Sequence, residues 1–347
     1  MSKTLKICMA GFGNLGKRFS QLMIEKEQYL LDEYGCKFVI TGISTRSRGT
    51  LINPEGINLQ DALDMVINNG KFDPEYPGYT TGDTVEMIKN SQADIFIEMS
   101  TLSIEDGQPA TDYMKLAFDL GMHVITANKG PEAWHYKELK QIAKDKGLCY
   151  LYETIVMDGT PIFNLMTETL HGNELLGFRG ILNGTSNFVL CQLEKGYTYD
   201  EAIKEAQRIG LAEADPSMDM DGWDGAAKLC AMTNILMDCQ ITPKMVEVHS
   251  VAHITKEDIE KAKEEGFRIK YICEAKRDPV TKEITAKVSP QKLLISDSFS
   301  NVNDTSAAVT LYTDLAGEMT IIQTDPGILQ TAYGVYSDLI TLVKTIK

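Results

Sequence analysis

Short apolar runs and stretches of helical periodicity alternate along the first part of the chain. Runs rich in Ile, Val, Phe and Leu predict strands at residues 5–10, 37–44, 93–99, 123–126 and 148–153. Apolar residues at helical spacing predict helices from residue 17 onward and at 59–68, 84–89, 111–120 and 132–146. This alternation is typical of an α/β fold with a parallel sheet. Residues 50–80, rich in Asn, Gly, Pro and Tyr, are expected to form an irregular crossover around one helix.

The pattern changes character near residue 152, where we place a domain boundary. Beyond it we expect strands at residues 176–182, 269–275, 284–290, 307–312 and 319–323, with the second and third paired. Helices are expected at 161–170, 199–209, 242–252 and 256–265, from 223 onward, and at 331–347. Because 347 residues are too many for one small core, we predict two domains.

Composition excludes several classes of partner. The formal net charge is −15 and no basic stripe is visible, which argues against nucleic acid and anionic membranes. No apolar run approaches the ~20 residues of a membrane span, and no signal peptide is recognised before the first predicted strand. The seven cysteines are scattered and never form a C-x-x-C pair, which indicates free thiols in a reducing compartment. We therefore expect a cytoplasmic protein.

A glycine-rich turn, GFGNLG at residues 11–16, directly follows the first predicted strand and precedes a helix. This is the context that a dinucleotide-binding G-x-G-x-x-G motif requires. Gly11 would permit the turn, Gly13 would let the backbone approach a pyrophosphate, and Gly16 would allow close helix packing. The free N–H groups of the helix N-terminus would then face the anion. We predict that this segment binds a dinucleotide.

The end of the second predicted strand carries two arginines, Arg46 and Arg48. An NAD site usually has a carboxylate here for the ribose 2′-hydroxyl, but none follows until Glu55. Arginines and hydroxyls suit a 2′-phosphate instead, so the hypothesis is a preference for NADP(H). The alternative is that both arginines are ordinary surface residues.

Further candidates lie at the carboxyl ends of predicted strands, where open α/β sheets bind ligands. Ser100 and Thr101 follow the strand at 93–99 and are expected to line a nicotinamide pocket. Lys129 follows the strand at 123–126, which would point it toward the same cleft. The alternative is that Lys129 is an ordinary lysine exposed to solvent.

The stretch 211–235 begins as a polar loop and becomes helical near residue 223. Asp224 and Lys228 are one helical turn apart, and the same side of the helix continues with Ala231 and Ile235. Lys228 therefore points toward an interior or a cleft, where a lysine is costly unless it is paired or has a purpose. The alternative is a surface ion pair.

Two other sets of polar residues indicate a function less specifically. Residues 183–187, NGTSN, could hold a small polar ligand or simply cap a helix. His249 and His253 are four residues apart but lack the Glu of a H-E-x-x-H motif, so we do not expect a metal there.

Taken together, these motifs resemble the homoserine dehydrogenase family in its short form, which lacks a regulatory domain. The resemblance covers nearly the whole chain. It rests on residues 11–16, on VITANKGP at 124–131, ETIVMDGTP at 153–161, GILNGTSN at 180–187 and AEADP at 212–216, and on Asp219, Asp224 and Lys228. Leu211 and residues 325–330 depart from the family pattern.

The resemblance implies a hydride transfer between NAD(P) and L-homoserine, which interconverts it with L-aspartate 4-semialdehyde in the amino-acid biosynthesis that leads to threonine and methionine. It implies a Rossmann-type domain at residues 1–152 with 328–347, and an α+β substrate-binding and dimerisation domain at 153–327. The expected assembly is a homodimer.

The resemblance also implies the roles of individual residues. The catalytic pair would be Lys129 and Lys228, and the substrate ligands would be Glu213, Asp224, Asp219, Thr185 and Gly210. Cofactor contacts would come from Gly11, Gly13, Asn14, Leu15, Gly16, Arg46, Arg48, Ser100, Thr101, Lys129 and Gly327. A sodium ion would be held, mostly by backbone oxygens, on the segment that supplies Glu153, Val156, Asp158 and Thr160.

The chemistry of the residues agrees with these roles. Reduction of an aldehyde places negative charge on oxygen, which an ammonium or a bound water can stabilise and protonate. A second lysine nearby would lower the pKa of the first. Two alternatives stay open: a related dehydrogenase of another hydroxy or amino acid, and a cofactor-binding protein without turnover.

Overall fold

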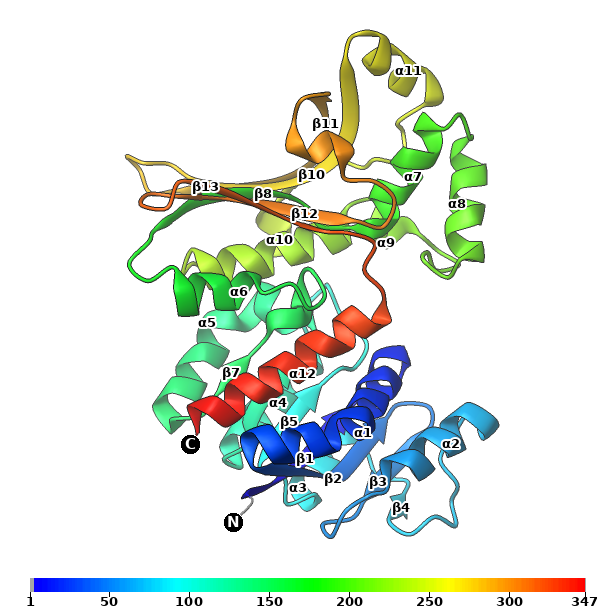
Figure 1. Cartoon of the computed structure of the whole chain (residues 1–347), viewed down its shortest axis with the longest axis vertical. Coiled ribbons are helices and arrows are strands. Elements are labelled where there is room, and N and C mark those ends of the chain that lie inside the picture. The colour runs from blue at the N-terminus through cyan, green and yellow to red at the C-terminus, as the bar shows by residue number, and fades with distance from the viewer. Residues whose placement is uncertain (1–2, 347) are drawn as a thin grey trace. The chain divides into compact units, whose positions relative to one another are not determined.

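The structure is a computed structural model that describes residues 3–346, and it divides into two compact units (Figure 1). Unit 1 comprises the described parts of Met1–Pro131, His135–Ile162 and Gly327–Lys347. Unit 2 comprises Glu132–Trp134 and Phe163–Pro326. Each unit is described by itself below.

Unit 1 is built on a sheet of seven strands in the order β4-β3-β2-β1-β5-β6-β7. The five strands from β2 to β7 in this order are parallel, as predicted. The bounds are β1 Lys3–Ala10, β2 Cys36–Thr45, β3 Gly49–Ile52, β4 Tyr79–Thr80, β5 Ile95–Glu98, β6 His123–Thr126 and β7 Tyr150–Leu151.

Helices cover both faces of this sheet, because the strands are apolar on both sides. In β1, Ile7 and Met9 join one core cluster, which also contains residues of α1, α2 and α12. The alternate residues Cys8 and Ala10 join a second cluster with residues of α3, α4 and α5. The bounds are α1 Asn14–Tyr34, α2 Leu59–Asn69, α3 Thr84–Asn90, α4 Ala110–Asp119, α5 Lys129–Lys146, η1 Glu153–Ile155 and α12 Ile328–Thr345.

The crossover at residues 50–80 is more regular than expected. The helix predicted at 59–68 is present as α2, but β3 and β4 flank the crossover and extend the sheet. β3 pairs antiparallel with β2, and β4 pairs antiparallel with β3. Such short strands owe their conformation to the neighbours they pair with, which the local sequence pattern does not reveal.

Unit 2 carries a six-stranded sheet in the order β13-β12-β8-β10-β11-β9. The predicted pairing of two long strands is confirmed, because β10 and β11 form an antiparallel hairpin from Phe267↔Leu294 to Arg277↔Ile284. The strands are β8 Leu175–Ile181, β9 Glu247–Val248, β10 Phe267–Arg277, β11 Ile284–Leu294, β12 Ala307–Thr313 and β13 Glu318–Gln323. The helices are α6 Ile162–Asn164, η2 Leu165–Thr169, α7 Gly184–Glu194, α8 Tyr199–Arg208, α9 Ser217–Met220, α10 Trp223–Leu236, η3 Pro243–Met245, α11 Lys256–Glu264 and η4 Ser298–Asn301.

The helix predicted at residues 242–252 is wrong. The segment forms only the short 3-10 turn η3 and the strand β9, whose Glu247 and Val248 pair in parallel with Lys287 and Val288 of β11. Pro243 lacks an N–H group and begins the short turn, and the strand pairing then outcompetes a weak helical periodicity. The C-terminal helix predicted to reach residue 347 is present as α12, but Lys347 lies outside the described residues.

A buried polar network holds α7 against the loop that precedes β12. The Asn187 Nδ2 donates to the carbonyl oxygens of Val302 and Asp304, both at 3.1 Å, and of Ser306 at 3.3 Å. The Lys270 ammonium, which is fully buried, donates to Val302 O at 2.7 Å and to Asn187 Oδ1 at 3.3 Å. Because unpaired buried polar groups are costly, each member of this network depends on the others.

We therefore expect Asn187→Ala to lower the free energy of unfolding by about 2–3 kcal/mol, because it removes the amide that pairs with three carbonyl oxygens and one acceptor of the buried Lys270 ammonium, which keeps Val302 O. The exposed Asn301 in the same unit is the matched control, and Asn301→Ala should stay within about 0.5 kcal/mol of the parent. Urea unfolding followed by circular dichroism measures both. Equal stability of the two variants would refute the importance of the network.

Candidate active site

The glycine turn of unit 1 has the geometry that the sequence predicts. Gly11 has a φ of +98°, and a Cβ there would lie 2.2 Å from the carbonyl oxygen of Met99. A Cβ on Gly16 would lie 2.6 Å from Gly11 O. Gly13 is the N-cap of α1, and a Cβ there would meet no atom within 4 Å. Two glycines therefore let the backbone pack closely, while the third faces open space at a helix N-terminus.

A cavity of about 730 Å³ lies beside this turn, entirely within unit 1. It brings together many of the predicted cofactor contacts, because Gly11, Gly13, Arg46, Arg48, Ser100 and Thr101 all line it. The other predicted contacts, Asn14, Leu15, Gly16, Lys129 and Gly327, are not among its lining residues. The cavity lies at the carboxyl ends of β1, β2 and β5, where parallel sheets bind ligands.

The two arginines differ in their surroundings. Arg46 is exposed, whereas Arg48 is half-buried and donates from Nη1 to Phe12 O at 2.7 Å. The backbone N–H of Arg48 donates to Thr45 Oγ1 at 2.8 Å. Arg48 therefore ties the end of β2 to the glycine turn, and it adds positive charge to one end of the cavity.

Lys129 is the first residue of α5 and is half-buried. The helix predicted from residue 132 thus begins three residues earlier, because Asn128 acts as its N-cap and accepts the Gly130 N–H at 3.1 Å. β6 ends at Thr126, so Lys129 stands close after a strand end, as predicted.

In unit 2, Asn183 joins two carboxylates that are distant in sequence. Its Nδ2 donates to Asp219 Oδ1 at 2.7 Å and to Asp224 Oδ2 at 2.8 Å. Asp224 Oδ2 also lies 3.2 Å from the Lys228 ammonium, which donates to Leu182 O at 2.8 Å. Asn183 was not singled out in the sequence; the polar turn at 183–187 was its only signal.

The Asp224–Lys228 pair is not a surface ion pair. Its side chains are only 14% and 18% exposed, and Ala231 and Ile235 on the same helix are buried. Burial and the neighbouring Asp224 carboxylate raise the pKa of Asp219, while Asn183, Thr185 and Lys228 act in the opposite direction. Lys228 therefore lies on the inward-facing side of α10, half-buried, as the prediction of an interior or a cleft requires.

The remaining predicted substrate ligands lie near the loop that follows α8. Thr185 is buried and donates to Leu211 O at 3.4 Å. Glu213 is exposed, and its carbonyl oxygen accepts from Gln207 Nε2 at 3.1 Å. Gly210 is exposed with a φ of +76°. These contacts fix the backbone of the loop and leave the Glu213 carboxylate toward solvent.

The predicted sodium segment lies in unit 1. Glu153, Val156 and Thr160 are buried, and Asp158 has a φ of +48°. The Glu153 N–H donates to Asp338 Oδ2 at 2.9 Å, and burial raises the pKa of Asp338. Within residues 3–346, no group of three His, Cys, Asp or Glu residues is arranged to hold a metal. That finding does not test a site made of backbone oxygens, so the sodium ion stays a prediction.

Known proteins resemble this chain over nearly its whole length. A family model described as homoserine dehydrogenase matches residues 161–340. A relative named NAD(+)-dependent homoserine dehydrogenase, from Pseudomonas canavaninivorans, is 34% identical over 96% of this chain and 95% of its own length. A homoserine dehydrogenase of Methanocaldococcus jannaschii is 36% identical over 99% of this chain and 100% of its own.

The chain belongs to the homoserine dehydrogenase family. A solved homoserine dehydrogenase structure from Archaeoglobus fulgidus has the same fold, with a TM-score of 0.87, 29% identity, and coverage of 98% of this chain and 99% of the other. As a homoserine dehydrogenase family member, the chain is an NAD(P)-dependent oxidoreductase that acts on a CH–OH group. No helix within the described part of the chain is long and apolar enough to cross a membrane.

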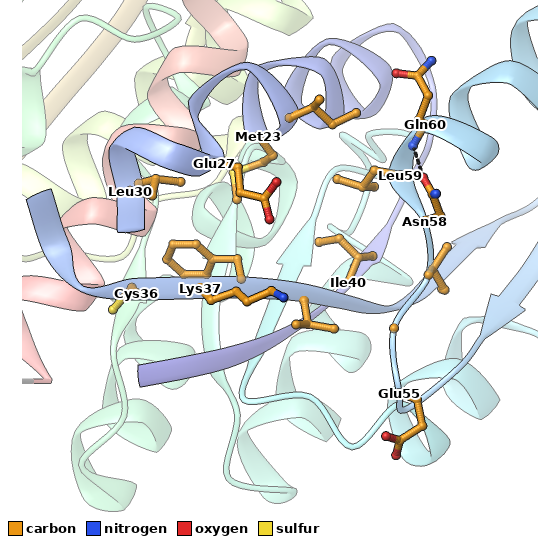
Figure 2. Close-up of a pocket in the computed structure, with 15 residues that line it drawn as sticks. Met23, Glu27, Leu30, Cys36, Lys37, Ile40, Glu55, Asn58, Leu59 and Gln60 are labelled. Atoms are coloured by element: carbon orange, nitrogen blue, oxygen red, sulfur yellow. Dashed lines mark hydrogen bonds between the residues drawn. The ribbon is translucent and has the colours of Figure 1, made fainter. Parts of the chain in front are cut away.

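A second cavity, of about 450 Å³, lies elsewhere in unit 1 (Figure 2). Met23, Leu30, Ile40 and other apolar side chains of α1 and β2 line it, together with residues 55–60. It adjoins the amino-terminal half of β2, whereas the glycine turn lies at the carboxyl end of β1. This cavity is therefore distinct from the cavity beside the glycine turn.

The glycine turn yields a paired prediction. Gly11→Ala should cost roughly 2–4 kcal/mol of stability, because the backbone is left-handed and the methyl group would overlap Met99 O. Gly13→Ala should fold normally, yet bind NADPH at least about tenfold more weakly, because its methyl group enters the space left for a phosphate. Thermal melting and fluorescence titration measure the two effects. Normal NADPH binding by Gly13→Ala would exclude a phosphate at this turn.

Proposed function

We propose that Lys228 and Lys129 carry the chemistry by which this family member interconverts L-homoserine and L-aspartate 4-semialdehyde. The observation that supports this most strongly is the buried cluster of unit 2, in which Asp224 and the Leu182 carbonyl hold the Lys228 ammonium. The Lys228 side chain is only 18% exposed and the pKa of the neighbouring Asp219 is raised, and titratable groups with shifted pKa values gather at active sites.

Lys228 is suited to stabilise charge on an oxygen atom. When an aldehyde is reduced, negative charge develops on the carbonyl oxygen and a proton must be delivered there. The ammonium supplies both the charge and the proton, and its hydrogen bond to Leu182 O fixes its direction. In the oxidative direction the neutral amine accepts the hydroxyl proton. Lys129, at the start of α5, is proposed as the second catalytic lysine.

The carboxylates are proposed to bind the ammonium end of the substrate. Asp219 and Asp224 are held side by side by Asn183, and the Glu213 carboxylate remains exposed on the loop after α8. Two or three carboxylates near one position attract a cation and fix its orientation. Thr185 of α7, which donates to Leu211 O of this loop, and Gly210 are proposed as further contacts of the substrate.

The cavity of unit 1 is proposed to bind NADP(H), which when bound would supply or accept the hydride. Gly11, Gly13, Asn14, Leu15 and Gly16 form the N-terminal turn of α1 that would hold the pyrophosphate. Ser100 and Thr101 would line the nicotinamide end, with Lys129 and Gly327 as further contacts. Gly13 fits this role because its backbone faces open space.

The preference for NADP(H) over NAD(H) rests on Arg46 and Arg48. Both line the cavity at the end of β2, and the lining residues from 44 to 50 include no carboxylate that would bind a ribose 2′-hydroxyl. A relative is named as NAD(+)-dependent, so the family as a whole does not decide the choice. The local charge favours the 2′-phosphate.

The remaining family expectations are also proposals. We propose that residues 1–152 with 328–347 bind the cofactor, that residues 153–327 bind substrate and form a homodimer, and that a sodium ion binds at Glu153, Val156, Asp158 and Thr160. The strand β13 supports a dimer, because within residues 3–346 it pairs with β12 alone and its Ile322 is exposed.

Lys228→Ala should lower kcat for homoserine oxidation by roughly 10²–10⁴-fold, because the group that exchanges the proton is lost. Its affinity for NADPH should stay unchanged. Lys256→Ala is the matched control, since Lys256 forms a comparable pair with Glu260 on an exposed helix of the same unit. A spectrophotometric assay of NADP reduction, run on homoserine and a panel of other hydroxy and amino acids, measures both variants. Near-normal turnover by Lys228→Ala would remove the residue from the mechanism.

Arg46→Ala should raise the KM for NADPH by about tenfold, because a charge-assisted hydrogen bond to the 2′-phosphate is lost. The KM for NADH serves as the internal control and should hardly change. Steady-state kinetics with both cofactors test this. A parent enzyme that uses NADH much better than NADPH would contradict the assignment.

A further inference from the structure

A buried carboxyl group, Glu98, stands at the carboxyl end of β5 and has no role in the mechanism above. Glu98 is the last residue of β5, is 0% exposed, and pairs with Ala10 of β1 and Thr126 of β6. One carboxyl oxygen, Oε1, accepts the Ser100 N–H at 2.7 Å. The other, Oε2, has no hydrogen-bond partner within the described residues. A buried carboxyl group with a hydrogen bond to only one of its oxygens lowers the stability of the fold, so its presence calls for an explanation.

Two further polar atoms near Glu98 share this condition. Ser100 Oγ and Asn128 Nδ2 are buried and make no hydrogen bond of normal geometry within residues 3–346, although both side chains lie close enough to the Glu98 carboxyl to lower its pKa. Ser100 follows β5 and Asn128 follows β6, and these strands are neighbours in the sheet. Three under-satisfied polar groups therefore gather at the carboxyl ends of adjacent strands, where an α/β sheet binds its ligand.

Burial gives Glu98 an unusual protonation equilibrium. It raises the pKa of this carboxyl to about 7, against smaller lowering effects of Ser100 and Asn128. The residues that pair with or lie beside it, Ala10, Thr126, Ser100 and Asn128, carry no ionisable side chain, and the nearest lysine in the sequence at this strand end is Lys129. Both the carboxylate and the neutral acid of Glu98 are thus populated near pH 7.

Topology places Glu98 on the nicotinamide side of the cavity. The glycine turn follows β1, and the arginines proposed for the 2′-phosphate follow β2. Because β5 flanks β1 on the side opposite β2, a dinucleotide with its pyrophosphate at α1 extends its nicotinamide toward β5. Ser100 lines the cavity there, and the Glu98 carboxyl binds the main chain of Ser100.

We propose that Glu98 sets the balance between oxidised and reduced cofactor in this site. The oxidised nicotinamide ring is positively charged and the reduced ring is neutral, so a carboxylate behind the ring favours NADP⁺ over NADPH. The protonated acid removes that preference. This inference rests on the proposed binding of NADP(H) at the cavity of unit 1.

The binding of NADP⁺ and the ionisation of Glu98 are thermodynamically linked, and this linkage sets the direction of the pH effect. Bound NADP⁺ stabilises the carboxylate and lowers the pKa of Glu98, so its binding releases protons near pH 7. Affinity for NADP⁺ relative to NADPH therefore rises as the pH increases from 6 to 8. A tenfold stabilisation of the carboxylate corresponds to about a fivefold change in the affinity ratio over this range. Ionisation of the 2′-phosphate contributes equally to both cofactors, so it cancels in the ratio.

The test measures Kd for NADP⁺ and for NADPH at pH 6 and pH 8 by fluorescence titration of the full-length protein. In the parent, the ratio of the Kd for NADPH to the Kd for NADP⁺ should increase about fivefold from pH 6 to pH 8. In Glu98→Gln this ratio should stay constant, because the amide keeps an acceptor for the Ser100 N–H but cannot ionise. Asp94→Asn is the matched control: Asp94 precedes β5 at its other end and also accepts a backbone N–H, that of Lys6, at 2.7 Å. It should behave like the parent.

A second measurement needs no variant. Calorimetry of the parent at pH 7, in two buffers of different ionisation enthalpy, should show more proton release on NADP⁺ binding than on NADPH binding. Equal proton release for the two cofactors, or the parent pH dependence in Glu98→Gln, would overturn the role of Glu98. Failure to bind either cofactor would instead overturn the proposed function, so the two failures are distinguishable.

Discussion

The close approach of Gly11 to the main chain of Met99 is the constraint on which unit 1 depends. A side chain at Gly11 would overlap a carbonyl oxygen, so only glycine lets β1 turn directly into α1. This turn points the N-terminus of a 21-residue helix toward the cavity beside β5. The first N–H groups of that helix and Gly13, which faces open space, would then be available to an anion without any charged side chain.

The charged cluster of unit 2 depends on a different arrangement, in which half-buried charges are paired. Withdrawing an ammonium and two carboxylates from water opposes folding, and mutual pairing offsets only part of that cost. Asn183 reduces the repulsion between Asp219 and Asp224 by donating to both. The raised pKa of Asp219 shows that some repulsion and desolvation remain. A site that binds a substrate cation relieves this residual strain when it is occupied, which is consistent with an amino-acid ligand.

Much of the fold follows from local patterns. The alternation of strands and helices in unit 1 and the long hairpin β10–β11 were predicted, because each element is coded by the periodicity of its own residues. Three exceptions share one cause. β3, β4 and β9 are strands of two to four residues that exist because a neighbouring strand supplies hydrogen bonds. At residues 242–252 this pairing replaced an expected helix, since short segments take the structure that their surroundings impose.

The sequence by itself determined the glycine turn, the position of Lys129 after a strand, and the apolar face that draws Lys228 inward, because these depend on neighbours one or two helical turns away. Tertiary structure alone decided which distant groups meet. Asn183 reaches Asp219 and Asp224 across 36 and 41 residues. Glu98 lies within the strand predicted at 93–99, and only the packing of both sheet faces buries it and raises its pKa. Burial and pairing are properties of the whole fold, and no local pattern encodes them.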